Sequence, residues 1–152
     1  ATPRPVTAGY TLELTSLGVS APIVFEPTTS ITKITDALNR GVVHYVNTPD
    51  PGDWGVSIIV GHSSKPRGYY GKYAYTFSKL EKLDEGDTFR IIKDGVPMTF
   101  RISRKAILNP GTPDAAVLAE LENPTGKSVI LMTCWPTGSA SKRVAVRAEL
   151  VE

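Results

Sequence analysis

Three residues able to do covalent chemistry stand at the ends of segments with strong β-strand patterns. Cys134, the chain's single cysteine, ends the apolar run 128–134, and His62 ends the similar run 56–62. Arg143 opens a third β-rich segment close to the C-terminus. A thiolate can attack a carbonyl carbon, a neighbouring imidazole can exchange the proton, and a guanidinium can stabilise the oxyanion without titrating. Together these residue types predict nucleophilic attack on a carbonyl.

Side-chain alternation along strands suggests how these distant residues could meet. In the runs 56–62 and 128–134, the row of alternate side chains is largely apolar and ends in the reactive residue. In the segment 142–151 the even-numbered residues form an apolar row, and Arg143 belongs to the opposite row. If this last strand pairs antiparallel with the strand of Cys134, Arg143 lies near the thiol.

The same residues also allow a non-catalytic interpretation. A free cysteine in a strand is more often a small core residue, and a lone histidine is usually structural. We expect His44 to be structural, Arg147 and the other basic residues to form a solvated face, and Trp54 and Trp135 to pack. From these patterns alone, an enzyme and a β-barrel that only binds its partners both remain open.

Length and composition narrow the class of protein. A chain of 152 residues with 41% hydrophobic residues suits one domain, which we place at 10–152 behind a flexible, Pro-rich lead-in, 1–9. The 17 basic and 15 acidic residues are mixed along the chain, which argues against a nucleic-acid partner. One cysteine excludes an internal disulfide and a cysteine-rich zinc site. No stretch approaches the roughly 20 apolar residues of a membrane span.

Strand and turn signals predict a mainly all-β domain, an antiparallel barrel of about eight strands with two or three short helices. Asp94-Gly95 between two β-rich runs is typical of a hairpin turn. The expected strands include 10–14, 21–25, 56–60, 88–93, 97–104, 128–134 and 142–151. The expected helical segments are 36–40, 77–83 and 115–122.

Three segments, in this order along the chain, resemble the sortases, which are cysteine transpeptidases of bacterial surfaces. Residues 58–62 (Ile-Ile-Val-Gly-His) are similar to the strand that carries the family's histidine. Residues 131–134 (Leu-Met-Thr-Cys) resemble the Thr-Leu-x-Thr-Cys signature, keeping its Thr-Cys end but not its first threonine. Residues 142–146 resemble the strand bearing the arginine. The similarity extends over nearly the whole chain from about Tyr10.

This resemblance implies an eight-stranded sortase-like barrel and a ping-pong reaction. Cys134 would attack the Thr–Gly bond of an LPxTG-like sorting signal and form a thioacyl enzyme, which an amine, or water in a peptidase side reaction, then releases. His62 would be the general acid and base, and Arg143 would hold the substrate carbonyl or oxyanion. Thr133 would shape the oxyanion site, and Met132 would line the groove for the motif's leucine.

The resemblance also implies partners and location. The substrates would be surface proteins with a C-terminal sorting signal, and the acceptor a peptidoglycan precursor or a protein lysine. The enzyme would work at the extracytoplasmic face of the bacterial cell membrane, touching the membrane only through an anchor outside this sequence. No metal and no cofactor is expected. Segment 109–126 corresponds to the connection that sets sorting-motif preference.

Other cysteine enzymes fit less well. Papain-like proteases place the cysteine before the histidine, whereas here the histidine comes first. Chymotrypsin-like cysteine proteases need a Gly-x-Cys-Gly turn, and L,D-transpeptidases need a glycine beside the cysteine; Thr133-Cys134-Trp135 matches neither. The remaining alternative, a non-catalytic cell-surface binding barrel, predicts a buried Cys134 that does not meet His62 and Arg143.

Overall fold

The computed structural model describes residues 9–25, 31–62, 77, 80–108, 123–134 and 143–151. Within these ranges only the backbone is described at a few positions. They are Ile31, Ile34, Thr35, His62, Glu81, Ile107, Leu108, Thr133, Cys134 and Arg143. The expected helix at 115–122, and Trp135, lie outside the described residues.

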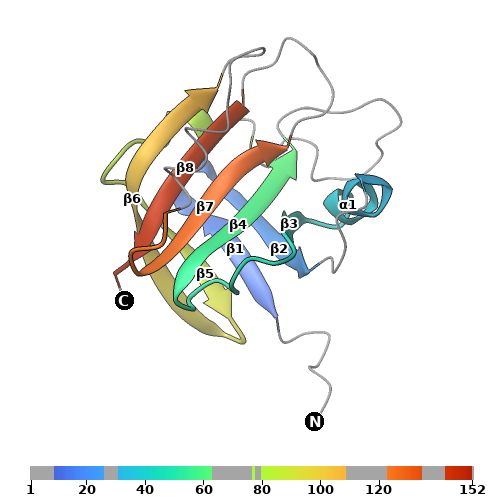
Figure 1. The fold of residues 1–152 in the computed structure, drawn as a ribbon, viewed down its shortest axis with the longest axis horizontal. Helices are drawn as coiled ribbons and strands as arrows, with labels where there is room; N and C mark the ends of the chain where they lie inside the picture. The colour runs from blue at the N-terminus through green and yellow to red at the C-terminus, as the bar shows by residue number, and fades with distance from the viewer. Residues whose placement is uncertain are drawn as a thin grey trace.

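The described strands close into a barrel in the order β1-β2-β3-β4-β7-β8-β6-β5 (Figure 1). The strands are Tyr10–Leu14 (β1), Val19–Phe25 (β2), Val42–His44 (β3), Gly55–His62 (β4), Thr88–Lys93 (β5), Val96–Leu108 (β6), Lys127–Cys134 (β7) and Arg143–Leu150 (β8). One α-helix, Ile31–Leu38 (α1), and two short 3-10 helices, Thr15–Leu17 (η1) and Leu80–Lys82 (η2), accompany them. The expected eight-stranded barrel is confirmed.

Local turn chemistry explains much of this order. Asp94 and Gly95 both have positive φ, 49° and 87°, as a two-residue hairpin between β5 and β6 requires. Gly18, with φ 70°, ends η1 and lets β1 fold back on β2. The Asp94-Gly95 turn lies where the sequence predicted it.

The pairing differs from the expected antiparallel barrel at two places. Strands β2 and β3 are parallel, and so are β4 and β7, while β7 and β8 are antiparallel as expected. The short strand β3, which includes His44, is not among the strands that the sequence predicts. The helix also begins earlier than expected, at Ile31 rather than near Asp36.

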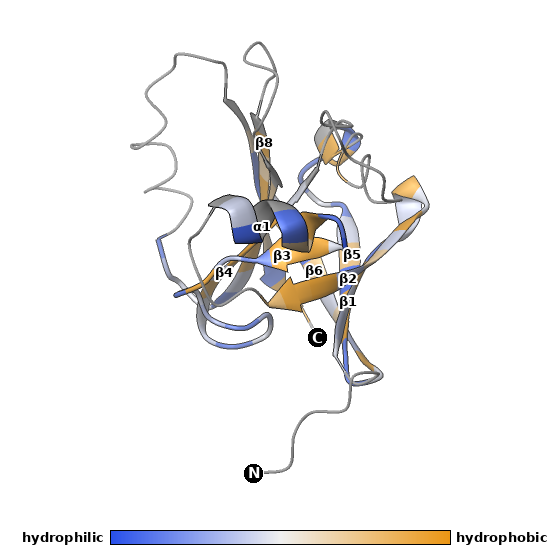
Figure 2. Cartoon of the chain, turned by 90° about the vertical axis from the view of Figure 1, so that its right-hand side faces the viewer, coloured by the Kyte–Doolittle hydropathy of each residue, from blue (hydrophilic) through white to orange (hydrophobic). Residues whose placement is uncertain are grey.

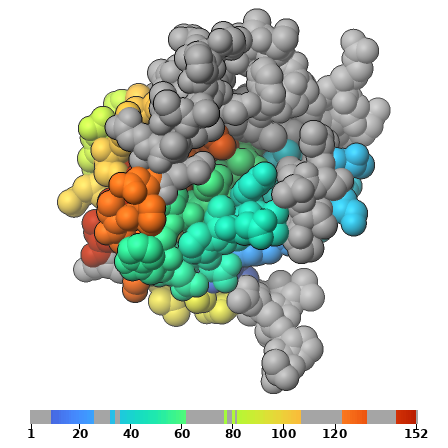
Figure 3. Space-filling view, in the orientation of Figure 1, coloured from blue at the N-terminus to red at the C-terminus, as the bar shows by residue number. Residues whose placement is uncertain are grey.

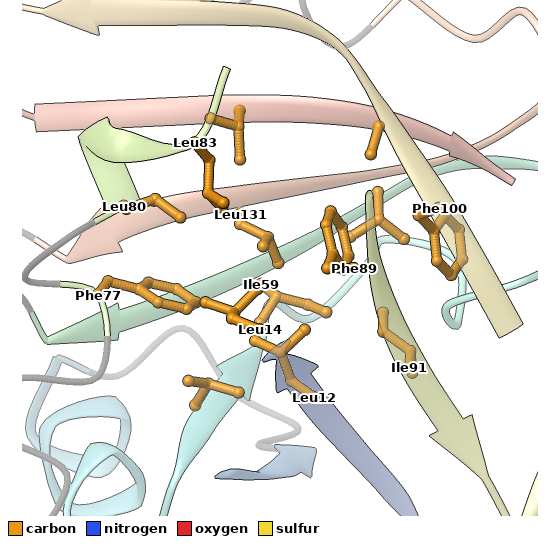
Figure 4. Packing of buried hydrophobic residues seen from close by; sticks show 14 of the residues in the cluster. Leu12, Leu14, Ile59, Phe77, Leu80, Leu83, Phe89, Ile91, Phe100 and Leu131 are labelled. Carbon is orange, nitrogen blue, oxygen red and sulfur yellow. The ribbon is translucent and has the colours of Figure 1, made fainter. Parts of the chain in front are cut away.

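The interior is filled by one row of each strand. Ile59 of β4 and Leu131 of β7 are fully buried, and the rings of Phe89 and Phe100 stack with centroids 5.7 Å apart (Figure 4). Burying one such side chain contributes about 1.5–3 kcal/mol. This core fixes which face of β4, β7 and β8 points inward, and therefore which face points out.

Helix α1 covers part of the outside. Its buried Ala37 and Leu38 pack with Val43 of β3 and Val60 of β4. In Figure 2, α1 lies beside β3, whose residues are coloured mostly as hydrophobic. The outer face of β4 is therefore partly apolar, and it continues into the site described next.

Candidate active site

His62 and Cys134 are the last residues of two neighbouring parallel strands. The β4–β7 ladder runs in register from Gly55 opposite Lys127 to His62 opposite Cys134. Adjacent strands lie about 4.8 Å apart, so two residues paired in this way stand at neighbouring positions of the same barrel end. Figure 1 shows the arrowheads of β4 and β7 side by side. The fold thus brings together His62 and Cys134, which are 72 positions apart in the sequence.

Arg143 opens β8, the strand on the other side of β7. The β7–β8 register pairs Met132 with Ala145. Arg143 stands two residues before Ala145, and Cys134 two residues after Met132, in the antiparallel strand. Continuing this register by two residues leads to Arg143 opposite Cys134. The backbone therefore carries the histidine, the cysteine and the arginine toward one end of three adjacent strands.

An apolar strip leads along the outside of the barrel to this end. Val129 and Leu131 belong to the interior core, so the residues that alternate with them on β7, Ile130 and Met132, face outward. The outer apolar strip consists of Ile58, Val60, Ala106, Ile130, Met132 and Ala145, which pack against one another or against Ala37 and Leu38. By strand alternation, His62 and Cys134 fall in the same two rows. Figure 3 shows this face with β4 atoms in green beside β7 atoms in orange.

A β-bulge brings β6 into the strip. Ile102 pairs with Ala148 on the inner row, but the register shifts between Ile102 and Arg104, so that Ala106 pairs with Ala145. One extra residue reverses the face of every later side chain in the strand. Ala106 consequently faces outward beside β8.

The predicted site residues are described to different depths. Met132 is half-buried and packs in the outer apolar strip. For His62, Thr133, Cys134 and Arg143 the structure describes the backbone and no side chain. Their chemical roles stay predictions, whereas their places at the ends of β4, β7 and β8 are observed.

Arg147 contradicts the expected solvated face. It is 7% exposed, and its guanidinium donates to the carbonyl oxygen of Asn123 at 2.7 Å and to Thr125 Oγ1 at 2.9 Å. Its Nε also donates to Glu149 Oε2 at 2.9 Å. Arg147 therefore fastens the segment before β7 onto β8. Ser128 of β7 completes the cluster, because its hydroxyl accepts from the Arg147 guanidinium. In the sequence, the one sign of this cluster is that Arg147 and Glu149 stand two positions apart and so share a strand face.

Glu149 is the acidic partner in this cluster. Partial burial would raise its pKa, but hydrogen bonds from Ser128, Ser103 and Arg147 and the charge of Arg147 outweigh that effect and lower the pKa. The native state therefore favours the ionised carboxylate more than the unfolded chain does.

This lowered pKa predicts an acid-dependent loss of stability. The contribution of Glu149 is present above the carboxyl's ordinary pKa in the unfolded chain and disappears as pH falls through the lower native pKa. We expect the free energy of unfolding, measured with urea between pH 6 and pH 3, to fall less steeply in Glu149→Gln than in the wild type. Asp36→Asn is the matched control, because Asp36 lies on an exposed helix face. Parallel pH curves for wild type and Glu149→Gln would contradict this assignment.

The structure agrees with the role expected for His44 but not with the one expected for Trp54. His44 is buried, and its Nε2 donates to the carbonyl oxygen of Pro49 at 2.8 Å, which agrees with a structural role. Trp54 is 63% exposed, so the expectation that it packs is wrong. It precedes β4, at the opposite end of that strand from His62.

Two negative observations apply to the described ranges. No helix there combines the length and apolarity that a membrane crossing requires. Within the same part of the chain, His, Cys, Asp and Glu side chains form no group of three able to hold a metal ion.

Several solved sortases have a similar barrel. A lid mutant of sortase A from Corynebacterium diphtheriae superposes with TM-score 0.71 at 24% identity, covering 99% of this chain and 73% of that one. Sortase A from the same organism gives TM-score 0.71 at 23% identity, covering 99% and 63%. Sortase C-1 from Actinomyces oris gives 0.69 at 24%, covering 94% and 73%. The fold is therefore the sortase barrel, and this chain spans under two thirds of one of these relatives.

The family follows from the sequence match. The sortase domain model matches residues 12–151, nearly the whole chain, and no curated protein matches. The chain belongs to the sortase family. Because sortases are transpeptidases, membership implies this general class of enzyme.

Proposed function

We propose that this chain is a cysteine transpeptidase that cleaves an LPxTG-like sorting signal and transfers the released acyl group to an amine. One observation carries the proposal: His62 and Cys134 are paired residues at the ends of the parallel strands β4 and β7. Arg143 begins the strand that flanks β7. A thiol, an imidazole and a guanidinium at such positions are the groups that acyl transfer through a thioester needs.

In the first half of the reaction, Cys134 acts as nucleophile. Its thiolate sulfur attacks the threonine carbonyl carbon of the Thr–Gly bond, and the carbonyl oxygen becomes an oxyanion. Arg143 stabilises that charge, and Thr133 helps shape its surroundings. The C–N bond then breaks as the His62 imidazolium gives its proton to the departing glycine nitrogen. The products are a thioester on Cys134 and a free amino terminus.

In the second half, an amine attacks the thioester carbonyl. Neutral His62 takes the proton from the attacking nitrogen, and the sulfur of Cys134 leaves as thiolate, which restores the starting enzyme. The acceptor is a peptidoglycan precursor or a protein lysine. Water in place of the amine gives hydrolysis, the peptidase reaction.

The outer apolar strip gives the sorting signal a surface to bind. Met132 lies two residues before Cys134 on this strip, where it would contact the leucine of the motif. The leucine and proline side chains are apolar, so their burial against the half-buried Ile58 and Met132 would supply binding energy at a fixed distance from the reacting carbonyl.

The family also supports a place of action. We propose that residues 10–152 form one catalytic domain working at the extracytoplasmic face of the bacterial membrane, held there by an anchor outside this sequence. Its substrates would be surface proteins with a C-terminal sorting signal. The reaction scheme needs no metal and no cofactor.

Mass spectrometry of the intact protein tests this function. The protein is incubated with an LPxTG-type peptide, and with variants changed at the leucine, proline or threonine. We expect an adduct equal in mass to the acyl part of the peptide through threonine, carried by Cys134. Alkylation with iodoacetamide beforehand blocks the adduct, because the chain has a single cysteine. A folded protein that forms no adduct with any peptide would favour a non-catalytic binding barrel.

A further inference from the structure

Gly61 occupies a position where a strand would ordinarily carry a side chain. It precedes His62 on β4 and is paired with Thr133, the residue before Cys134. Its φ is not among the positive values found at other glycines of the described chain. The backbone conformation therefore does not require glycine, and glycine inside a strand weakens it. The explanation must lie in what surrounds the position.

The surrounding group is the ring of Phe77. A Cβ atom placed on Gly61 would lie 2.7 Å from Cδ2 and 2.8 Å from Cε2 of Phe77, closer than real Cβ contacts allow. Phe77 is 1% exposed and belongs to the interior core with Ile59 and Leu131. Figure 4 shows Phe77 close to the C-terminal end of β4. The ring thus packs directly against the bare backbone of Gly61.

Backbone hydrogen bonds and buried leucines that follow Phe77 in the chain fix the position of its ring. Leu80 N donates to the carbonyl oxygen of Phe77 at 3.1 Å, and Leu83 N donates to that of Leu80, also at 3.1 Å. Leu80 and Leu83 are both buried in the same core. Withdrawing the Phe77 ring would therefore disturb this whole turn, and well-packed cores resist such movement.

We infer that Phe77 is a positioning residue for the reaction: through Gly61 it sets the place of His62 relative to Cys134. The Gly61–Thr133 pair is the last step of the ladder before the reactive pair, so a displacement there reaches His62 directly. The inference rests on the proposed function, because it assigns a consequence to the His62–Cys134 pairing. Phe77 itself does not touch the substrate, and it acts from the interior face of the barrel.

Gly61→Ala is the test, with acyl transfer to an amine as the assay. The added methyl must move the ring or the end of β4, and a shift approaching 1 Å at a catalytic group can cost about 100-fold in rate. We expect kcat to fall about 10- to 100-fold, with KM for the peptide nearly unchanged, because the outer apolar strip is untouched. The rate of Cys134 alkylation by iodoacetamide as a function of pH should shift as well.

Rescue distinguishes positioning from simple damage. Phe77→Leu removes ring atoms next to position 61, so the double variant Gly61→Ala/Phe77→Leu should regain most of the kcat and the wild-type alkylation profile. Gly9→Ala is the matched control, since nothing lies within 4 Å of a Cβ at that glycine. It should leave kcat unchanged.

The outcomes separate this inference from the proposed function. An active wild type with an unaffected Gly61→Ala variant would overturn the inference alone. A loss that Phe77→Leu does not relieve would overturn it too. A folded wild type without any acyl adduct would overturn the proposed function and this inference together.

Discussion

Replacing Cys134 with alanine is expected to abolish the thioester adduct and all acyl transfer. The substitution removes only the sulfur that the proposed mechanism uses as nucleophile, and no other cysteine in the chain can replace it. Loss of a nucleophile typically lowers the rate on the order of 10³-fold or more. We expect activity below detection in an assay that follows release of the glycine-bearing peptide fragment. The melting temperature, measured by circular dichroism, should stay within a few degrees of the wild type.

His62→Ala supplies the contrasting variant. It keeps the thiol but loses the group proposed to donate and accept the proton, so the adduct should form slowly and be released even more slowly. If the Cys134→Ala protein still cleaved the peptide, the transpeptidase mechanism through a thioester would be wrong. If His62→Ala matched the wild type across the pH range, a different group would carry the proton.

The sequence predicted most strands because their signals are local. Alternating apolar rows identified β4, β7 and β8, and Asp94-Gly95 located the hairpin between β5 and β6. The antiparallel pairing of β7 with β8 also followed from their closeness along the chain. These features depend on neighbouring residues, which is why they could be read directly.

Long-range features could not be predicted in the same way. The parallel pairing of β4 with β7 joins segments far apart in sequence, and nothing within either segment specifies the partner's direction. The short strand β3 gains its place from pairing with β2 and β4 rather than from its own pattern. Alternating rows placed His62 and Cys134 at the ends of two strands, and the family resemblance made them a catalytic pair, but neither predicted that the two strands pair directly and in parallel.

The side-chain contacts made by Arg147 and Gly61 could not be predicted from the sequence either. Arg147 reads as an ordinary surface charge, since its partners Asn123 and Thr125 lie more than 20 residues away. The contact between Gly61 and the ring of Phe77 also depends on a turn outside β4. In both cases the sequence specifies the residue type, and only the three-dimensional arrangement explains why that type is needed.

Arg143 and Arg147 offer a second decisive test, because they share one row of β8 and take the same substitution. In the proposed mechanism, Arg143→Lys replaces a planar, multiply donating group with a point charge beside the reacting carbonyl. Losing an oxyanion donor costs on the order of 10²–10³-fold in kcat. We expect that loss in a peptide-transfer assay, with the melting temperature unchanged.

Arg147→Lys should have the opposite effect. An ammonium group cannot reach Asn123 O, Thr125 Oγ1 and Glu149 together, and each lost hydrogen bond to a buried charged group matters. We expect the free energy of unfolding to fall by about 2 kcal/mol, as urea denaturation would measure, with kcat nearly unchanged well below the melting temperature. Equal losses of activity in the two variants would show that Arg143 is not the arginine that meets the substrate. Equal losses of stability would show instead that both arginines are structural.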